Sequence, residues 1–480
     1  MDTVSLQYAS LLGATAVLFW IFRKVFISAS ISGIILLLGG LAFFAAPIWS
    51  RPNDSVVERA LPVACFVCVL IITQIGVATK KALVPVILLT LILVAAKAAA
   101  AWFPKEETSL FAKIIIGSGL SYYILRAIAA VVDASRGTLK NATAPEVCGY
   151  LAFAPILSLG PIERATSFIN SWRKSVPLSD ASRLAFDGIC RIGEGLFKTL
   201  VMGDVARRFA EPFASGGFAQ SDLPSGQLSV AIFSYSLYLY INFSGASDIA
   251  IGAARIFGFK ITENFDIPYA RPNISEFWRA WHISLSTWLR DYLFFPLGKR
   301  LPRNAAPIIA PLIVMSLCGA WHGFTLTFVA WGFLHGAGLA IHQLWLRARR
   351  GSERIDRLAG NVAWRTLATV VTVFFVTFTW VFFSARSTGD ALDHLQRIVI
   401  DLAARPDIFA YAALTAAAWS FVPGIRDWLR AKAAQDRITV ISQMAAWWRV
   451  HIDIVCILVV IARFVLARTQ PAGAFVYQNF

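Results

Sequence analysis

The sequence predicts an all-α, polytopic integral membrane protein, and composition and segment length are the observations that predict it. Of the 480 residues, 57% are hydrophobic and only 15% are charged, whereas soluble globular proteins are about 25% charged. Apolar runs recur at close to the ~20 residues that a helix needs to cross a bilayer. We expect roughly 10–13 membrane helices, with re-entrant or interfacial helices around a central cavity.

The chain divides into three stretches. Residues 1–145 are expected to form N-terminal membrane helices, with spans at residues 8–22, 25–49, 60–79, 82–103 and 109–132. In residues 146–347, polar, Gly- and Pro-containing pieces interrupt the apolar segments, for example at Gly160-Pro161. Irregular backbone at membrane depth is tolerated only where it is buried or lines a cavity, so this stretch is the expected catalytic membrane core. Residues 348–480 are expected to form C-terminal membrane helices, near 364–384, 408–422 and 452–467.

The net charge of +16 would suggest a nucleic-acid partner in a soluble protein. Here the basic residues fall mainly between apolar segments, which favours membrane anchoring and a positive-inside bias. The lipid bilayer is therefore the expected partner, and no nucleic acid is expected. The start of the chain lacks a positively charged region, so we expect a retained first helix rather than a cleavable signal peptide.

The six cysteines do not suggest a disulfide framework. Cys65 and Cys68 form a CxxC pair inside a largely apolar run, and no second pair follows at zinc spacing. Buried, unreactive thiols are the favoured interpretation. No metal site is predicted.

Two histidines, His322 and His335, lie in membrane-type sequence. His322 occurs in Ser316–Gly323 (SLCGAWHG), with uncharged apolar runs on both sides. An ionisable side chain in such a position is costly, and by default it indicates a functional site. The alternative is a histidine that hydrogen-bonds to a neighbouring helix along a polar seam.

The segment Arg271–Arg300 is predicted to be one amphipathic helix, capped by Asn273 with Glu276 and ended by Pro296-Leu297-Gly298. Its aromatic face holds Trp278, Trp281, Leu285, Trp288 and Tyr292. A second face holds Ser275, Arg279, His282, Ser286 and Arg290. A plain interfacial anchor is the alternative for most of these residues, but the position of His282 between Arg and Ser could bind an anionic group.

Polar residues also occur in the apolar stretch Tyr240–Asp248, including Asn242 and Asp248. Helix–helix hydrogen bonding explains Ser and Asn at such positions. Asp248 is harder to explain in this way, because a buried carboxylate needs a partner.

Four motifs resemble the membrane-bound O-acyltransferases, in the bacterial branch that contains alginate O-acetyltransferases and teichoic acid D-alanyltransferases. They are Tyr240–Gly252, Glu263–Tyr269, Glu276–Gly298 and Cys318–Gly323. The resemblance implies that His322 is the catalytic histidine and that His282 occupies the family's second characteristic position. Asn242 stands where the alginate-type pattern usually has Asp, which leaves Asp248 as the local carboxylate.

The expected chemistry is acyl transfer to a hydroxyl, with His322 as the general base and Asn242 and Trp321 as candidate oxyanion donors. The predicted substrate-binding residues are Asn242, Asp248, Arg279, Trp281, Arg290 and Trp321. The face of Arg279, His282 and Arg290 is expected to hold an anionic donor.

The resemblance implies no bound cofactor. The donor would be a cytoplasmic thioester, acetyl-CoA or an acyl-carrier protein, and the acceptor a cell-surface or exported polysaccharide. It further implies a multi-pass protein of the bacterial inner membrane and an extracytoplasmic, esterase-like partner in acetyl transfer. Two alternatives stay open: D-alanyl transfer from a carrier protein to teichoic acid, and a non-enzymatic transporter of a polar solute.

Overall fold

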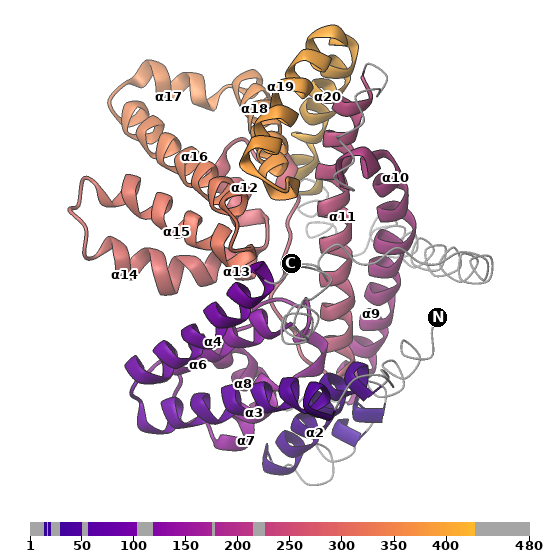
Figure 1. The fold of residues 1–480 in the computed structure, drawn as a ribbon, viewed down its shortest axis with the longest axis vertical. Coiled ribbons are helices and arrows are strands. Elements are labelled where there is room, and N and C mark those ends of the chain that lie inside the picture. Colours follow the sequence, from indigo (N-terminus) through magenta and orange to yellow (C-terminus); the bar gives the residue numbers. More distant parts are fainter. Residues whose placement is uncertain are drawn as a thin grey trace. The chain divides into compact units, whose positions relative to one another are not determined.

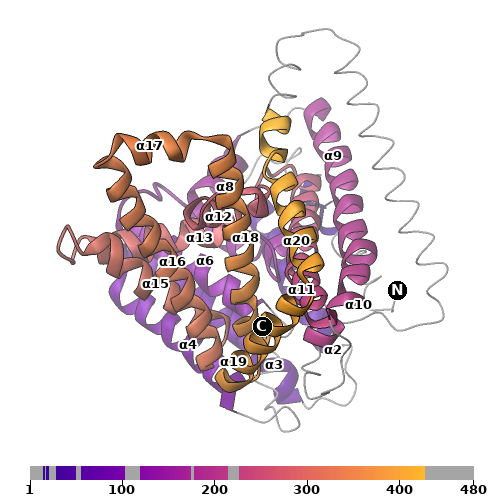
Figure 2. The ribbon, with the colours of Figure 1, turned by 90° about the horizontal axis from the view of Figure 1, so that it is seen from above.

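A computed structural model of the chain describes residues 14–16, 18–20, 29–49, 56–102, 119–174, 178–214 and 226–427. Every secondary-structure element in these residues is a helix (Figures 1 and 2), which confirms the predicted all-α class for the part described. The chain forms two compact units. Among the described residues, the first unit consists of those up to Phe197 together with the segment Gly245–Glu263. The second takes Lys198–Ser244 and those from Asn264 onward.

Besides the helical residues 14–16 and 18–20, seven α-helices and part of an eighth build the described portion of the first unit. They are α2 (Ala29–Trp49), α3 (Val56–Thr79), α4 (Leu83–Trp102), α6 (Leu120–Ser135), α7 (Ala144–Leu151), α8 (Ala165–Arg173), α9 (Leu178–Phe197) and the last residues of α11 (Gln227–Ile256). A 3₁₀ turn, η1 (Ala154–Ile156), and a buried non-helical segment separate α7 from α8. The predicted break at Gly160-Pro161 lies in that segment.

Helices occur at most of the predicted spans. The spans 25–49, 60–79 and 82–103 correspond to α2, α3 and α4, and α6 covers the end of 109–132. Most of span 8–22, and all of 452–467, lie outside the described residues. Two described helices are long and apolar enough to cross a membrane, Val362–Ser384 and Pro406–Asp427. The number of membrane helices therefore stays a prediction.

Glycines bring α9 and α11 close together in the first unit. A Cβ added at Gly188 would lie 2.6 Å from the carbonyl oxygen of Gly252, and one at Gly195 would lie 2.6 Å from that of Gly245. Neither helix can carry a larger residue there without moving. Small residues that permit such close approach are characteristic of helix pairs in membrane proteins.

The second unit contains a longer series of helical elements. They are the π-helix η2 (Lys198–Met202), α10 (Gly203–Ala214), the start of α11, the 3₁₀ turn η4 (Pro268–Ala270), α12 (Ile274–Ala280), α13 (Ile283–Leu289), the π-helix η5 (Arg290–Phe294), α14 (Phe295–Gly298), α15 (Ala306–His322), α16 (Leu326–Arg350), α17 (Glu353–Gly360), α18 (Val362–Ser384), α19 (Thr388–Ala404) and α20 (Pro406–Trp419).

The single helix predicted over Arg271–Arg300 is wrong, because the segment folds as α12, α13, η5 and α14. Its start is as predicted: the Asn273 side chain accepts a hydrogen bond from the Glu276 N–H. Trp281 is extended, however, and His282 has a left-handed backbone with φ 42°. A left-handed residue cannot continue an α-helix, so one helical face cannot run through this break.

Helices α15 and α16 form a tightly packed hairpin through glycines. A Cβ at Gly319 would overlap the carbonyl oxygen of Phe328, and one at Gly332 would overlap that of Met315. The turn of this hairpin begins directly after His322, the last residue of α15. The glycines therefore fix the position of the backbone that carries His322.

Asp401 of α19 caps the start of α11 within the second unit. Its carboxylate accepts hydrogen bonds from the backbone N–H of Gly226, and from the N–H and Oγ of Ser229 at 2.9 and 2.6 Å. Burial acts to raise the pKa of Asp401, but the bonds from Ser229 and Gly226, aided by the charge of Arg405, outweigh it and hold the pKa below its usual value.

This cap predicts a pH-dependent stability. A carboxyl group with a lowered native pKa stabilises the fold above its unfolded pKa of about 3.9 and loses that contribution as the pH falls through the native value. We expect Asp401→Asn to cost about 1 kcal/mol at neutral pH, as a lost helix cap does. The difference in thermal unfolding midpoint from wild type should shrink below about pH 4. A difference that stays constant with pH would contradict this role.

Candidate active site

His322 lies in an aromatic pocket of the second unit. It ends α15, where Gly323 adopts an extended backbone, and its side chain is half-buried. Its ring centroid lies 4.7 Å from that of Trp321, 5.4 Å from that of Trp331 and 5.3 Å from that of Phe383. The imidazole is therefore enclosed by rings and still partly open, as a group that meets a substrate must be.

The aromatic contacts continue from His322 to His282. Phe383 contacts Trp380, which contacts Trp281 at 5.3 Å between ring centroids. Trp281 contacts Phe265, Phe265 contacts Phe243, and Phe243 lies 4.7 Å from the His282 ring. The second unit thus brings four predicted site residues to one aromatic cluster: His322, Trp321, Trp281 and His282.

The hydrogen bonds around His282 define its tautomer. The Asn264 Oδ1 accepts from the Ser284 N–H at 3.3 Å and from the Ser284 Oγ at 2.7 Å. The same oxygen lies 3.2 Å from the His282 Nδ1. Because Oδ1 can only accept, Nδ1 must carry the proton. The lone pair of neutral His282 is then on Nε2, so this side chain could also act as a base.

Sequence reasoning did not single out Asn264, although it lies in the motif Glu263–Tyr269. Its backbone oxygen also accepts from the Ile283 N–H at 2.9 Å, so Asn264 holds both the left-handed turn and the start of α13. The sequence offers one sign of this role: Asn264 stands at a position where no predicted helix begins that it could cap. The turn itself could not be foreseen, since its partners come from a separate segment.

Replacement of Asn264 is expected to destabilise the protein. Asn264→Ala would leave the buried Ser284 and His282 donors without their acceptor, which typically costs about 1–3 kcal/mol. Ser284→Ala, the matched control, removes one donor and leaves the acceptor bonded, and should cost less. Thermal unfolding of the purified proteins in detergent measures both. Equal midpoints for wild type and Asn264→Ala would contradict the role given to this residue.

His335 is completely buried in the second unit, and its hydrogen bonds are those of a structural residue. Its Nδ1 accepts from the Trp278 indole N–H at 3.2 Å. Its Nε2 therefore carries the proton and donates to the Thr379 Oγ1 at 2.9 Å. With both ring nitrogens engaged, His335 connects α12, α16 and α18.

Asn242 and Trp331 are buried residues of the second unit that each have an unused polar atom. The side chain of Asn242 hydrogen-bonds to Tyr238, and its Oδ1 has no donor among the described residues. The Trp331 Nε1 likewise has no acceptor among them, although the residue is 1% exposed. Sequence reasoning missed Trp331, because a tryptophan in an apolar helix is usually interpreted as a packing residue. Its position against His322 is apparent only in the fold.

Asp248 belongs to the first unit, unlike the other predicted site residues. It is 6% exposed. Its Oδ1 accepts from the Nε and Nη2 of Arg191 on α9, at 3.0 and 2.8 Å. The expected partner of this buried carboxylate is therefore an arginine that the sequence did not point to. Arg191 also binds Glu263, at 2.6 Å from Nη1 to Oε1.

Arg279, His282 and Arg290 do not share a face, because of the break at His282. Arg279 lines a cavity of α12, α16, α17 and α18, whereas His282 is 2% exposed. Arg290 pairs with its neighbour Asp291 at 2.8 Å. The substrate-binding roles of the two arginines stay predictions, but the shared basic face that motivated them is absent.

The described residues contain no group of three or more His, Cys, Asp or Glu side chains placed to hold a metal ion. The polar groups near His322 and His282 are imidazoles, indoles, amides and hydroxyls. Such groups suit proton transfer and hydrogen bonding to an organic substrate.

Comparisons with known proteins are consistent with this arrangement. Residues 66–385 match the model of the MBOAT, membrane-bound O-acyltransferase family. Over 275 residues the chain is 34% identical to the probable alginate O-acetylase AlgI of Azotobacter vinelandii, which covers 57% of this chain and 52% of that protein.

Two further relatives carry different names. The peptidoglycan O-acetyltransferase of Helicobacter pylori is 33% identical over 251 residues, covering 52% of this chain and 46% of that protein. The teichoic acid D-alanyltransferase of Streptococcus thermophilus is 28% identical over 250 residues, covering 50% of this chain and 60% of that protein. The chain thus spans about half the length of these curated relatives.

Proposed function

This chain belongs to the membrane-bound O-acyltransferase family, and we propose on that premise that it is an O-acetyltransferase of the bacterial inner membrane. The donor is a cytoplasmic thioester, acetyl-CoA or an acyl carrier, and the acceptors are hydroxyl groups of a cell-surface or exported polysaccharide. The alginate and peptidoglycan O-acetyltransferases among the relatives support the acetyl group and the glycan acceptor.

The observation that carries the proposal is the environment of His322. The residue lies within the matched region, at a helix end that glycines hold in place, and is half-buried among rings. An imidazole held in this way and still partly open can accept the proton of a substrate hydroxyl. A general base in this position typically contributes about 10²–10⁴-fold to the rate.

The His322 imidazole accepts the proton of the acceptor hydroxyl while its oxygen attacks the thioester carbonyl carbon. The resulting tetrahedral oxyanion collapses, the C–S bond breaks, and the leaving thiolate takes the proton from the imidazolium. We propose that Asn242 and Trp321 contact the substrate during this step. Trp281 packs in the same aromatic cluster. An extracytoplasmic, esterase-like partner could complete delivery to the glycan.

The second candidate is D-alanyl transfer from a carrier protein to teichoic acid, which the similarity to the Streptococcus thermophilus enzyme favours. Mass spectrometry of surface glycans from cells with and without this protein separates the two. The proposal predicts acetyl esters on a polysaccharide that disappear with the protein. Loss of D-alanyl esters instead would support the second candidate, and unchanged glycans would contradict both.

A further inference from the structure

A groove of the second unit encloses about 820 Å³ between α12, α16, α17 and α18. Neither His322 nor His282 lines it, so the transfer step does not account for it. Its walls combine apolar side chains, two tryptophans and several arginines. That combination requires a ligand with both an apolar and an anionic part.

Helices α16 and α18 run along the groove in opposite directions, as two contacts between them show. At one end Trp345 stacks on Trp364, with ring centroids 5.5 Å apart, and Arg365 follows directly. At the other end a Cβ at Gly338 would lie 3.1 Å from the Phe375 ring. Trp364 and Phe375 are separated by about 16 Å along an α-helix.

The apolar wall of the groove includes exposed side chains. Leu367 and Val371 on α18 are 54% and 59% exposed, and Ile341 on α16 is 65% exposed. Helix α18 is one of the two described helices that are long and apolar enough to cross a membrane. In a membrane protein such a surface faces acyl chains. Stacked tryptophans beside arginines are typical of the membrane–water interface.

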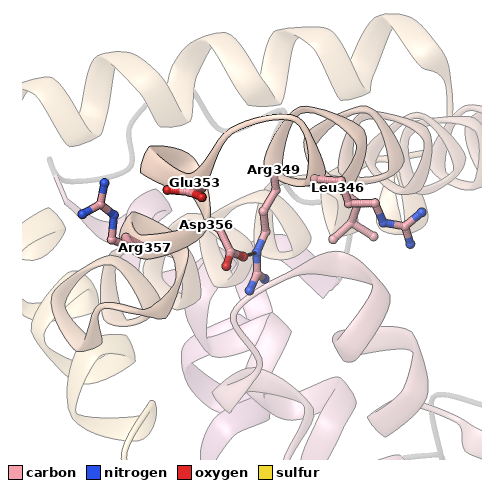
Figure 3. Close-up of a pocket in the computed structure, with 6 residues that line it drawn as sticks. Leu346, Arg349, Glu353, Asp356 and Arg357 are labelled. Atoms are coloured by element: carbon pink, nitrogen blue, oxygen red, sulfur yellow. Dashed lines mark hydrogen bonds and ion pairs between the residues drawn. The ribbon is translucent and has the colours of Figure 1, made fainter.

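Three arginines line the groove, Arg279, Arg349 and Arg365, and Glu276 is the carboxylate among the described residues that line it. Arg349 also lines an adjoining cavity of about 670 Å³, where its guanidinium binds Asp356 (Figure 3). Neither Arg279 nor Arg365 has an ion pair with a described residue. The groove therefore offers unneutralised guanidinium groups to an anion.

We propose that this groove binds an anionic phospholipid. The phosphodiester lies at the end that holds Arg365, where guanidinium groups bind phosphate oxygens strongly. An acyl chain lies along Leu367, Val371 and Ile341 toward Phe375. Basic pockets beside membrane helices recognise anionic headgroups in this way. The inference does not rest on the proposed acyl transfer, since lipid binding can be measured without a donor.

The test compares the binding of phosphatidylglycerol with that of phosphatidylcholine carrying the same acyl chains. Each lipid is added to the purified full-length protein in detergent, and native mass spectrometry counts the lipid molecules bound. We expect phosphatidylglycerol to bind more tightly. Arg365→Gln should weaken it about tenfold, the effect of one lost charged hydrogen bond. Ala368→Phe, which fills the groove without changing its charge, should weaken both lipids. Arg354→Gln removes a charge from α17 outside both cavities and should change nothing.

Three results would overturn the proposal. Equal binding of the two lipids would show that the headgroup charge is not recognised. Equal loss in Arg365→Gln and Arg354→Gln would indicate general attraction to a basic surface. Displacement of the bound phosphatidylglycerol by acetyl-CoA would assign the groove to the donor instead. All variants must elute as folded protein.

Discussion

His322→Ala is expected to lower acyl transfer by about 10²–10⁴-fold per folded molecule, the usual contribution of a general base. The side chain is half-buried and ends its helix, so its removal leaves the glycine-packed hairpin of α15 and α16 in place. Initial rates with a thioester donor, divided by the amount of monodisperse protein, give the comparison.

His335→Ala is the matched control, one helix away. Its loss would leave the Trp278 indole and the Thr379 hydroxyl without their shared partner. We therefore expect a lower thermal unfolding midpoint, with the rate per folded molecule largely kept. Near-normal transfer in His322→Ala would refute the assignment. His282, whose neutral form carries its lone pair on Nε2, would then be the first alternative.

Arg191→Ala is expected to destabilise the protein by about 3–5 kcal/mol, because it leaves the Asp248 carboxylate buried without its cation. Asp248 is 6% exposed and takes two hydrogen bonds from this guanidinium. Adding Asp248→Asn removes the uncompensated charge, so the double variant should be more stable than Arg191→Ala alone. Thermal unfolding in detergent measures all three proteins.

Arg208→Ala provides the surface control for this prediction. Arg208 pairs with Asp204 at 3.1 Å while 69% exposed, and such pairs contribute about 1 kcal/mol or less. If Arg191→Ala cost no more than Arg208→Ala, the buried pair would not stabilise the fold. If the double variant were less stable than Arg191→Ala, Asp248 would act through contacts other than its charge.

Local signals in the sequence predicted the features that depend on near neighbours. Apolar runs predicted α2, α3 and α4, and Asn273 with Glu276 predicted the start of α12. Both rest on interactions within a few residues along the chain. The family resemblance supplied the role that we propose for His322, and the fold places this side chain among aromatic rings.

Features that depend on distant residues were not predictable. The left-handed backbone of His282 is held by Asn264, 18 positions earlier, so the regular spacing of side chains from Arg271 to Arg300 suggested one unbroken helix. Burial of Asp248 required a cation, but Arg191 lies 57 positions away on another helix. The contact of Trp331 with His322 depends on the packing of α15 against α16, as does the lack of an acceptor for the Trp331 Nε1 among the described residues.

The most direct test of the central claim uses purified protein in proteoliposomes, with acetyl-CoA labelled in the acetyl group on one side and an oligosaccharide acceptor on the other. Mass spectrometry follows the label. The account predicts acetyl esters on the oligosaccharide, formed together with free coenzyme A and lost in His322→Ala. Movement of the oligosaccharide across the membrane without covalent change would identify a transporter and contradict the account.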